Sequence, residues 1–191
     1  MNYLAHARLS PPDPLMTIGN LIADHVRGRL PEAWPSSLTA GVTMHRQTDN
    51  YFDHHPRIAA IRQGFPQGVR RFSGIAIDLA FDHWLALNWD AQEDISLEDF
   101  QQDISQLLRM HWQYIPNSQQ AFMDYLISRQ LFVRYQTPES ILNTAHRLAQ
   151  RFKDPEPLIA VTTTLVSSIE SYEEVFSDVW QDTQSHFENL P

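Results

Sequence analysis

The first half of the chain concentrates residue types that bind metals and transfer protons. Six of the nine histidines lie before residue 84, and the same stretch contains the aspartates Asp24, Asp49, Asp53, Asp78 and Asp82. The chain has no cysteine, so a bound metal would be held by His, Asp, Glu or water. Such ligands suit Mn²⁺, Mg²⁺ or Fe and also admit Zn²⁺. These residues favour metal-assisted hydrolysis.

Two sets of these residues follow the spacing of an α-helix, in which side chains four residues apart are stacked along one face. The first set is His45, Asp49 and Asp53, and the second is Asp78 and Asp82, which His83 follows directly. Two helices packed through these faces would bring carboxylates and imidazoles together. Crowded negative charge of this kind requires a cation or extensive hydrogen bonding to offset it.

Each of these residues also has a structural interpretation. A buried histidine bonded to a backbone carbonyl, or an aspartate that caps a neighbouring helix, is commoner than a metal ligand. The whole cluster could likewise be a structural network. His111, His146 and His186 stand alone on predicted helices and are assigned to structure or surface.

Apolar residues recur at spacings of three and four, whereas alternation bounded by tight turns is scarce, so the sequence predicts an all-α fold. We expect helices over 14–27, 37–51, 58–63, 74–89 and 97–114, and from Pro138 onward. Ser96 and Asp99 would cap the helix that begins at 97. The stretch 159–169 is rich in Thr and Val but has no partner strand, so a helix is predicted there too. Without repeats or linkers, residues 1–191 are predicted to form a single compact multi-helix domain.

Charge and hydropathy exclude some classes of protein. The net charge of -9 argues against a general nucleic-acid binder, which needs a surplus of Lys and Arg. Residues 1–80 carry a net charge of +2 and residues 81–191 carry -11, so the first half is the better place to meet an anionic partner. The chain shows no signal peptide and no apolar stretch of membrane-spanning length, so we expect a cytoplasmic protein that is not inserted in a membrane.

Four motifs resemble the acyl carrier protein phosphodiesterase family. They are MNYLAH at 1–6, GNLIADHVRG at 19–28, MHRQTDNYFDHHP at 44–56 and RRFSGIAIDLAFDHWLA at 70–86. The resemblance implies a helical fold distantly related to the HD-domain phosphohydrolases. It also implies hydrolysis of the phosphodiester that joins 4′-phosphopantetheine to a serine of holo acyl carrier protein. A divalent metal is implied too, foremost Mn²⁺, with Mg²⁺ or Fe as alternatives.

The resemblance also implies which residues act. The matching positions are His6, Asp24, His45, Asp49, Asp53, His55, Asp78 and His83. The predicted metal ligands are Asp24, His45, Asp49 and Asp78. The predicted catalytic residues are Asp24 and a nearby histidine, with His83 ahead of His55 or His6, which would orient a water or protonate the departing serine oxygen. The chain carries Asp-His pairs at 24–25, 53–54 and 82–83, where the HD signature has a His-Asp pair.

Acyl carrier proteins are small and acidic, so a net-negative enzyme requires a local basic docking surface. The predicted docking residues are Arg27, Arg46, Arg70 and Arg71. Two other functions fit the same residues. One is a metal phosphohydrolase of the same helical type that acts on a nucleotide or another small phosphate ester. The other is a non-catalytic helical module that binds an acidic partner. The number of metals and the oligomeric state stay open.

Overall fold

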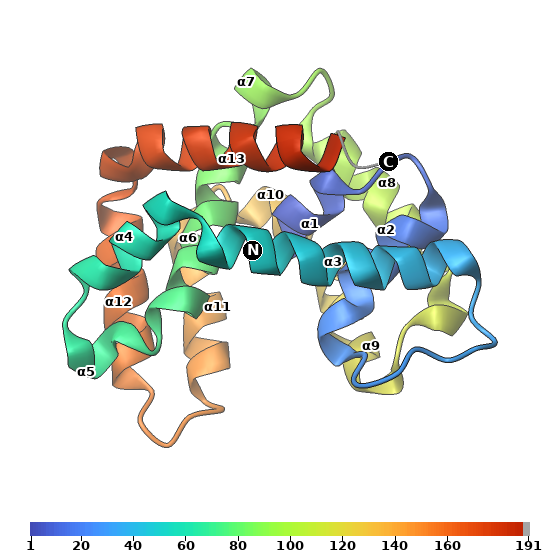
Figure 1. The fold of residues 1–191 in the computed structure, drawn as a ribbon, viewed down its shortest axis with the longest axis horizontal. Helices are drawn as coiled ribbons and strands as arrows, with labels where there is room; N and C mark the ends of the chain where they lie inside the picture. Colours follow the sequence, from blue (N-terminus) through green and yellow to red (C-terminus); the bar gives the residue numbers. More distant parts are fainter. Residues whose placement is uncertain (189–191) are drawn as a thin grey trace. The chain divides into compact units, whose positions relative to one another are not determined.

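The computed structural model describes residues 1–188, and within that range every regular element is helical (Figure 1). This confirms the all-α prediction. The chain separates into two compact units, each built from segments that are distant in the sequence. Unit 1 consists of residues 1–2, 50–87 and 135 onward, and unit 2 consists of residues 3–49 and 88–134. That residues 1–191 form one domain stays a prediction.

Unit 2 combines the N-terminal helices with those from the middle of the chain. Its elements are α1 (Tyr3–Leu9), α2 (Pro14–Ile22), the 3₁₀ turn η1 (Ala23–His25), the larger part of α3 (Ser36–His54), α7 (Trp89–Gln92), α8 (Leu97–Met110), η2 (Trp112–Tyr114), α9 (Asn117–Ser128) and α10 (Leu131–Arg134). Helix α1 packs on α2, α2 on α8, and α8, α9 and α10 on one another (Figure 1).

Two glycines allow α2 and α3 to pack at very short range. A Cβ atom built on Gly41 would lie 2.1 Å from the backbone oxygen of Met16. One built on Gly19 would lie 2.1 Å from the backbone oxygen of Leu38. Any larger side chain at either position would therefore push the two helices apart, and this close approach holds the C-terminal end of α2 against α3.

The expectation of one helix over 14–27 is wrong at its C-terminal end. Asp13 caps the N-terminus of α2 by accepting hydrogen bonds from two backbone N–H groups, but the α-helix ends at Ile22. The turn η1 follows, and residues 26–35 are not helical. Gly28 takes a φ of 74°, which glycine adopts readily, and Pro31 cannot continue a helix.

Unit 1 contains the remaining helices. They are the last turn of α3, α4 (Pro56–Gly64), α5 (Gln67–Arg70), α6 (Ser73–Leu87), α11 (Pro138–Ala149), α12 (Glu156–Ser167), the 3₁₀ turn η3 (Ile169–Tyr172) and α13 (Glu173–Glu188). Helices α6, α11 and α12 pack against one another (Figure 1).

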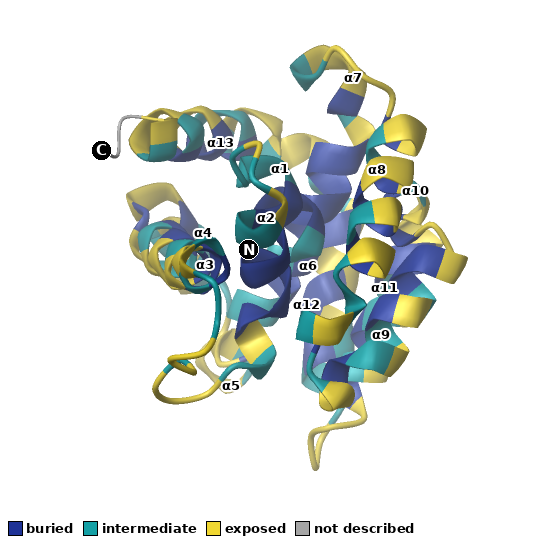
Figure 2. Cartoon of the chain, turned by 90° about the vertical axis from the view of Figure 1, so that its right-hand side faces the viewer, coloured by how far each residue is buried: buried dark blue, intermediate teal, exposed yellow. Residues whose placement is uncertain are grey.

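The core of unit 1 forms around α6, which is buried along most of its length (Figure 2). The Phe81 ring contacts Phe52 and Phe176 edge-on, with centroids 5.0 and 5.2 Å apart. Trp84 and Trp180 complete the group around Phe81. All five side chains are almost fully buried, so burial of aromatic surface stabilises this unit.

Other boundaries differ from the expectation by a turn or less. The helix expected over 97–114 is capped by Ser96 as predicted, but it ends at Met110 because His111 leaves the helical region with φ -113° and ψ 24°. The helix expected over 74–89 ends at Leu87. The stretch 159–169 is helical as predicted, in α12 up to Ser167 and in η3 from Ile169, whereas α9 was not anticipated. Among residues 1–188, no helix combines the length and hydropathy that a membrane span requires.

Candidate metal centre

Unit 2 brings four of the predicted site residues together around one carboxylate. His6 comes from α1, Asp24 from η1, and His45 and Asp49 from successive turns of α3. His6 Nε2 lies 3.0 Å from Asp49 Oδ1, and His45 Nε2 lies 3.1 Å from Asp49 Oδ2. Asp24 Oδ1 lies 3.2 Å from His45 Nε2. Two ring nitrogens thus converge on Asp49, and a second carboxylate approaches one of them.

The cluster has a buried imidazole side and a solvent-facing carboxylate side. The rings of His6 and His45 are stacked with centroids 3.9 Å apart, and both are buried. The side chain of Asp24 is 60 % exposed and that of Asp49 is 37 % exposed. A water molecule or an anionic substrate could therefore reach the cluster past its carboxylates.

The protonation of the two rings is unequal. Burial and the neighbouring His45 lower the pKa of His6 to about 4. Burial also opposes protonation of His45, but its hydrogen bonds with Asp24 and Asp49 outweigh that effect and raise its pKa to about 9. Burial disfavours the Asp49 carboxylate, yet hydrogen bonds from His45 and His6 lower its pKa below the usual value. At neutral pH His45 is therefore protonated between two carboxylates, whereas His6 is neutral.

The donor atoms fit a divalent cation. Ligand atoms of His6, His45 and Asp49 all lie within 4.8 Å of one another. Imidazole nitrogen together with carboxylate oxygen is a donor set that binds Mn²⁺, Fe or Zn²⁺. A divalent cation would displace the extra proton that His45 holds, because metal ligation requires neutral histidine.

Asn20 supports the cluster through the backbone of α1 and is not among the predicted site residues. Its side-chain Nδ2 donates to the backbone oxygen of His6 at 2.9 Å and to Ser10 Oγ at 3.0 Å. Asn20 is fully buried on α2, so it fixes the turn of α1 that carries His6. The signal for its role was a polar amide among the apolar residues of GNLIADHVRG, because buried amides are retained where they are hydrogen-bonded.

The other predicted aspartates belong to unit 1. Asp53 forms an ion pair with Arg62 of α4. Asp78 Oδ1 lies 3.1 Å from the Met1 nitrogen. The helical spacing of His45, Asp49 and Asp53 is present on α3 as expected, but the structure engages Asp53 with an arginine.

His55 and His83 both make structural contacts within unit 1. His55 is the N-cap of α4, where its Nδ1 accepts from the backbone N–H of Arg57, and its Nε2 lies 3.1 Å from Asp182 of α13. His83 is fully buried, and its Nδ1 donates to the Tyr135 carbonyl oxygen at 2.6 Å. Burial lowers the pKa of His83, so its ring is neutral. A buried histidine bonded to a carbonyl is the structural interpretation that the sequence left open.

The four arginines predicted to dock the partner differ in the contacts they make. Arg46 donates to the Val26 carbonyl oxygen at 2.9 Å, beside the exposed Arg27, and both lie in the unit that holds the cluster. The Arg70 guanidinium donates to the carbonyl oxygens of Gln63, in the last turn of α4, and of Phe65, which follows that helix. Arg71 is exposed, with its guanidinium carbon 4.6 Å from the centroid of the Phe72 ring.

A family profile and two relatives that are similar to this chain carry the same description. A family profile described as acyl carrier protein phosphodiesterase matches residues 1–183. A protein of that name from Shigella boydii serotype 18 is 34% identical over 155 residues, which cover 79% of each chain. One from Escherichia coli (strain K12 / DH10B) is 29% identical over 194 residues, which cover 100% of this chain and 90% of the relative. No solved structure matches the chain.

Proposed function

Because this chain belongs to the acyl carrier protein phosphodiesterase family, we propose that it hydrolyses the phosphodiester between 4′-phosphopantetheine and a serine of holo acyl carrier protein. The products would be 4′-phosphopantetheine and the apo carrier. The observation that supports this chemistry is the convergence of the His6 and His45 ring nitrogens on the Asp49 carboxylate, at the partly exposed edge of unit 2.

His6, His45 and Asp49 would hold a divalent cation, with Asp24 beside them, and Mn²⁺ is the proposed metal. When bound, such a cation supplies charge neutralisation of the phosphate oxygens and a lowered pKa of water. Asp78, one of the predicted ligands, lies in unit 1 beside the Met1 nitrogen and is not part of this proposed set.

The chain's own residues would prepare the reaction in three ways. Asp24, the most exposed carboxylate of the cluster, would orient the attacking water and accept its proton. Arg27 and Arg46, close in sequence to Asp24 and His45, would bind the phosphate oxygens through planar guanidinium groups. His6 is neutral and buried, so it would hold the Asp49 carboxylate in position and offer a ring nitrogen to the metal.

We further propose a distant relation to the HD-domain phosphohydrolases, which the helical placement of two His and two Asp side chains supports. A cytoplasmic location is also proposed, with which a chain free of cysteine is consistent.

The direct test is to incubate the purified protein with holo acyl carrier protein and Mn²⁺ and to follow the mass of the carrier. Loss of the phosphopantetheine mass is expected. The variant Asp24→Asn should lose turnover while keeping the helical circular dichroism spectrum, because it retains shape but not the carboxylate. Near-normal turnover by this variant would contradict the role of Asp24.

A parallel assay with nucleotides and small phosphate esters separates the main alternative. Rapid hydrolysis of a nucleotide with no change in the carrier's mass would replace the proposed substrate. Metal analysis separates the other alternative, since a binding module without turnover has no need of a bound transition metal. Binding of the holo carrier with neither turnover nor metal would assign that class.

A further inference from the structure

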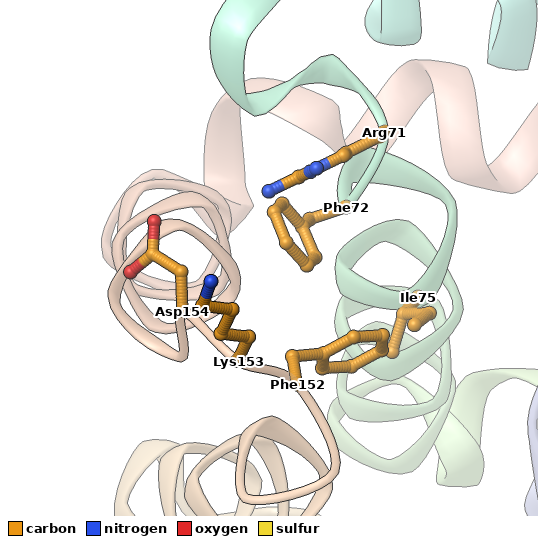
Figure 3. A pocket seen from close by; sticks show the side chains of 6 residues that line it. All are labelled: Arg71, Phe72, Ile75, Phe152, Lys153 and Asp154. Carbon is orange, nitrogen blue, oxygen red and sulfur yellow. The ribbon is translucent and has the colours of Figure 1, made fainter.

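Unit 1 carries a pocket of about 620 Å³ that plays no part in the candidate metal centre. It lies between the corner that joins α5 to α6 and the loop that joins α11 to α12 (Figure 3). The lining residues are Arg71, Phe72, Ile75, Phe152, Lys153 and Asp154. The sequence motifs included the first three of these residues but none of the last three.

The floor of the pocket is apolar and partly exposed to solvent. The Phe72 and Phe152 rings meet edge to face, with centroids 5.2 Å apart and an interplanar angle of 88°. Phe152 is 37 % exposed, and Ile75 extends the same surface (Figure 3). A large aromatic side chain left open beside a second ring is typical of surfaces that bind a partner.

Two exposed cations flank this floor. The Arg71 guanidinium is stacked over Phe72, and Lys153 projects from the opposite loop (Figure 3). Among the residues that the structure describes, neither Arg71 nor Lys153 has an ion-pair partner. One carboxylate, that of Asp154, also lines the pocket, so the cations outnumber the anions there.

This charge contrasts with its surroundings. Unit 1 contains 12 acidic and seven basic residues, so most of its surface would repel an acidic molecule. Arg70, which the sequence pairs with Arg71, is engaged with backbone carbonyl oxygens at the end of α4. Arg71 and Lys153 are therefore free to attract an acidic partner to an apolar surface.

We propose that this pocket docks the acidic surface of the carrier protein. One apolar side chain of the partner would pack on Phe72 and Phe152, while carboxylates on either side pair with Arg71 and Lys153. A free phosphate would gain nothing from the two phenyl rings, whereas an amphipathic protein surface uses both the rings and the cations. The identity of the partner rests on the proposed function.

The test compares charge reversals at matched, exposed positions. The variants are Lys153→Glu and Arg71→Glu in the pocket and Arg109→Glu on α8 as the control, since all three reverse one exposed cation. With Mn²⁺ present, the pocket variants should lower kcat/KM for the holo carrier at least tenfold through KM, with kcat within twofold of the parent. The Arg109 variant should change kcat/KM less than twofold. Phe152→Ser should also raise KM, and a thermal unfolding midpoint checks that it stays folded.

Direct binding separates this inference from the proposed function. Fluorescently labelled holo carrier is titrated with each protein, and the Lys153→Glu variant should bind at least tenfold more weakly. If the parent binds but does not turn the carrier over, and this variant loses binding, docking stands and the proposed function fails. If the parent turns the carrier over and both pocket variants behave like the Arg109 control, docking is overturned. If the parent binds ATP, and the Lys153→Glu variant loses ATP binding but keeps carrier binding, the pocket belongs to a nucleotide and docking is overturned too.

Discussion

Asp49 is the residue on which the candidate metal centre depends. Each of its carboxylate oxygens meets a different imidazole ring, with Oδ1 facing His6 and Oδ2 facing His45. A neutral amide at this position would offer one oxygen and one NH₂ group, and it would present a donor to one of the two rings. The cluster therefore depends on both oxygens of one side chain.

We expect Asp49→Asn to weaken Mn²⁺ binding at least ~100-fold, because it removes an anionic ligand together with the group that orients both rings. Asp53→Asn, one turn later on α3, should bind Mn²⁺ within threefold of the parent, since Asp53 pairs with Arg62. Isothermal titration with Mn²⁺ measures both affinities. Equal losses in the two variants would show that the ligand set includes Asp53.

His83 gives a prediction about pH and stability. Burial lowers the pKa of His83 from 6.5, so the unfolded chain binds a proton below pH 6.5 that the folded chain does not. Its contribution to stability is therefore lost as the pH falls below 6.5, with a limiting slope of about 1.4 kcal/mol per pH unit. Urea unfolding between pH 5 and 7 should show a shallower pH dependence for His83→Asn than for the parent. Parallel curves for the two proteins would contradict a buried neutral histidine.

At the scale of elements, close packing of α2 on α3 places Asp24 beside His45. Gly19 and Gly41 remove the side chains that would otherwise separate the two helices. Asn20, next to Gly19 on α2, holds the backbone of His6. The two glycines and the Asn20 amide thus fix the positions of α1, α2 and α3 relative to one another.

Gly41→Ala should lower the free energy of unfolding by about 1–3 kcal/mol, because the new Cβ would lie 2.1 Å from the Met16 backbone oxygen. Gly68→Ala on α5 is the matched control. Apart from the local backbone of α5, nothing lies within 4 Å of a Cβ at Gly68, and alanine favours a helix, so stability should be unchanged or higher by roughly 0.5–1 kcal/mol. Urea unfolding measures both. A larger loss at Gly68 than at Gly41 would contradict the packing described for α2 and α3.

At the scale of the molecule, a cation that binds only the folded chain must raise its stability. We expect Mn²⁺ at about 100 times its Kd to add about 2.7 kcal/mol to the free energy of unfolding, and EDTA to reverse this. His45→Gln should keep its thermal midpoint unchanged on addition of Mn²⁺, because it lacks one of the converging nitrogens. Differential scanning calorimetry makes the comparison. An equal rise in the parent and in the variant would place the cation elsewhere.

The sequence by itself determined the helical class and the local part of the centre. Apolar spacing predicted an all-α chain, and the interval of four residues between His45 and Asp49 placed both on one face of α3, because helical geometry is a local property of the backbone. The family motifs predicted His6 and Asp24 as site residues, without placing them against α3.

Only the tertiary structure decided which residues share the site. His6 and Asp49 are separated by 43 positions, and their contact depends on how α1 packs, which no local pattern specifies. The same holds for Asp53, whose partner Arg62 lies on the next helix, and for His83, whose ring bonds to a carbonyl 52 residues away. Spacing fixes the face on which a side chain lies, but long-range packing fixes what that side chain meets. The His- and Asp-rich first half therefore yields one four-residue cluster in unit 2, while Asp53, His55 and His83 make contacts within unit 1.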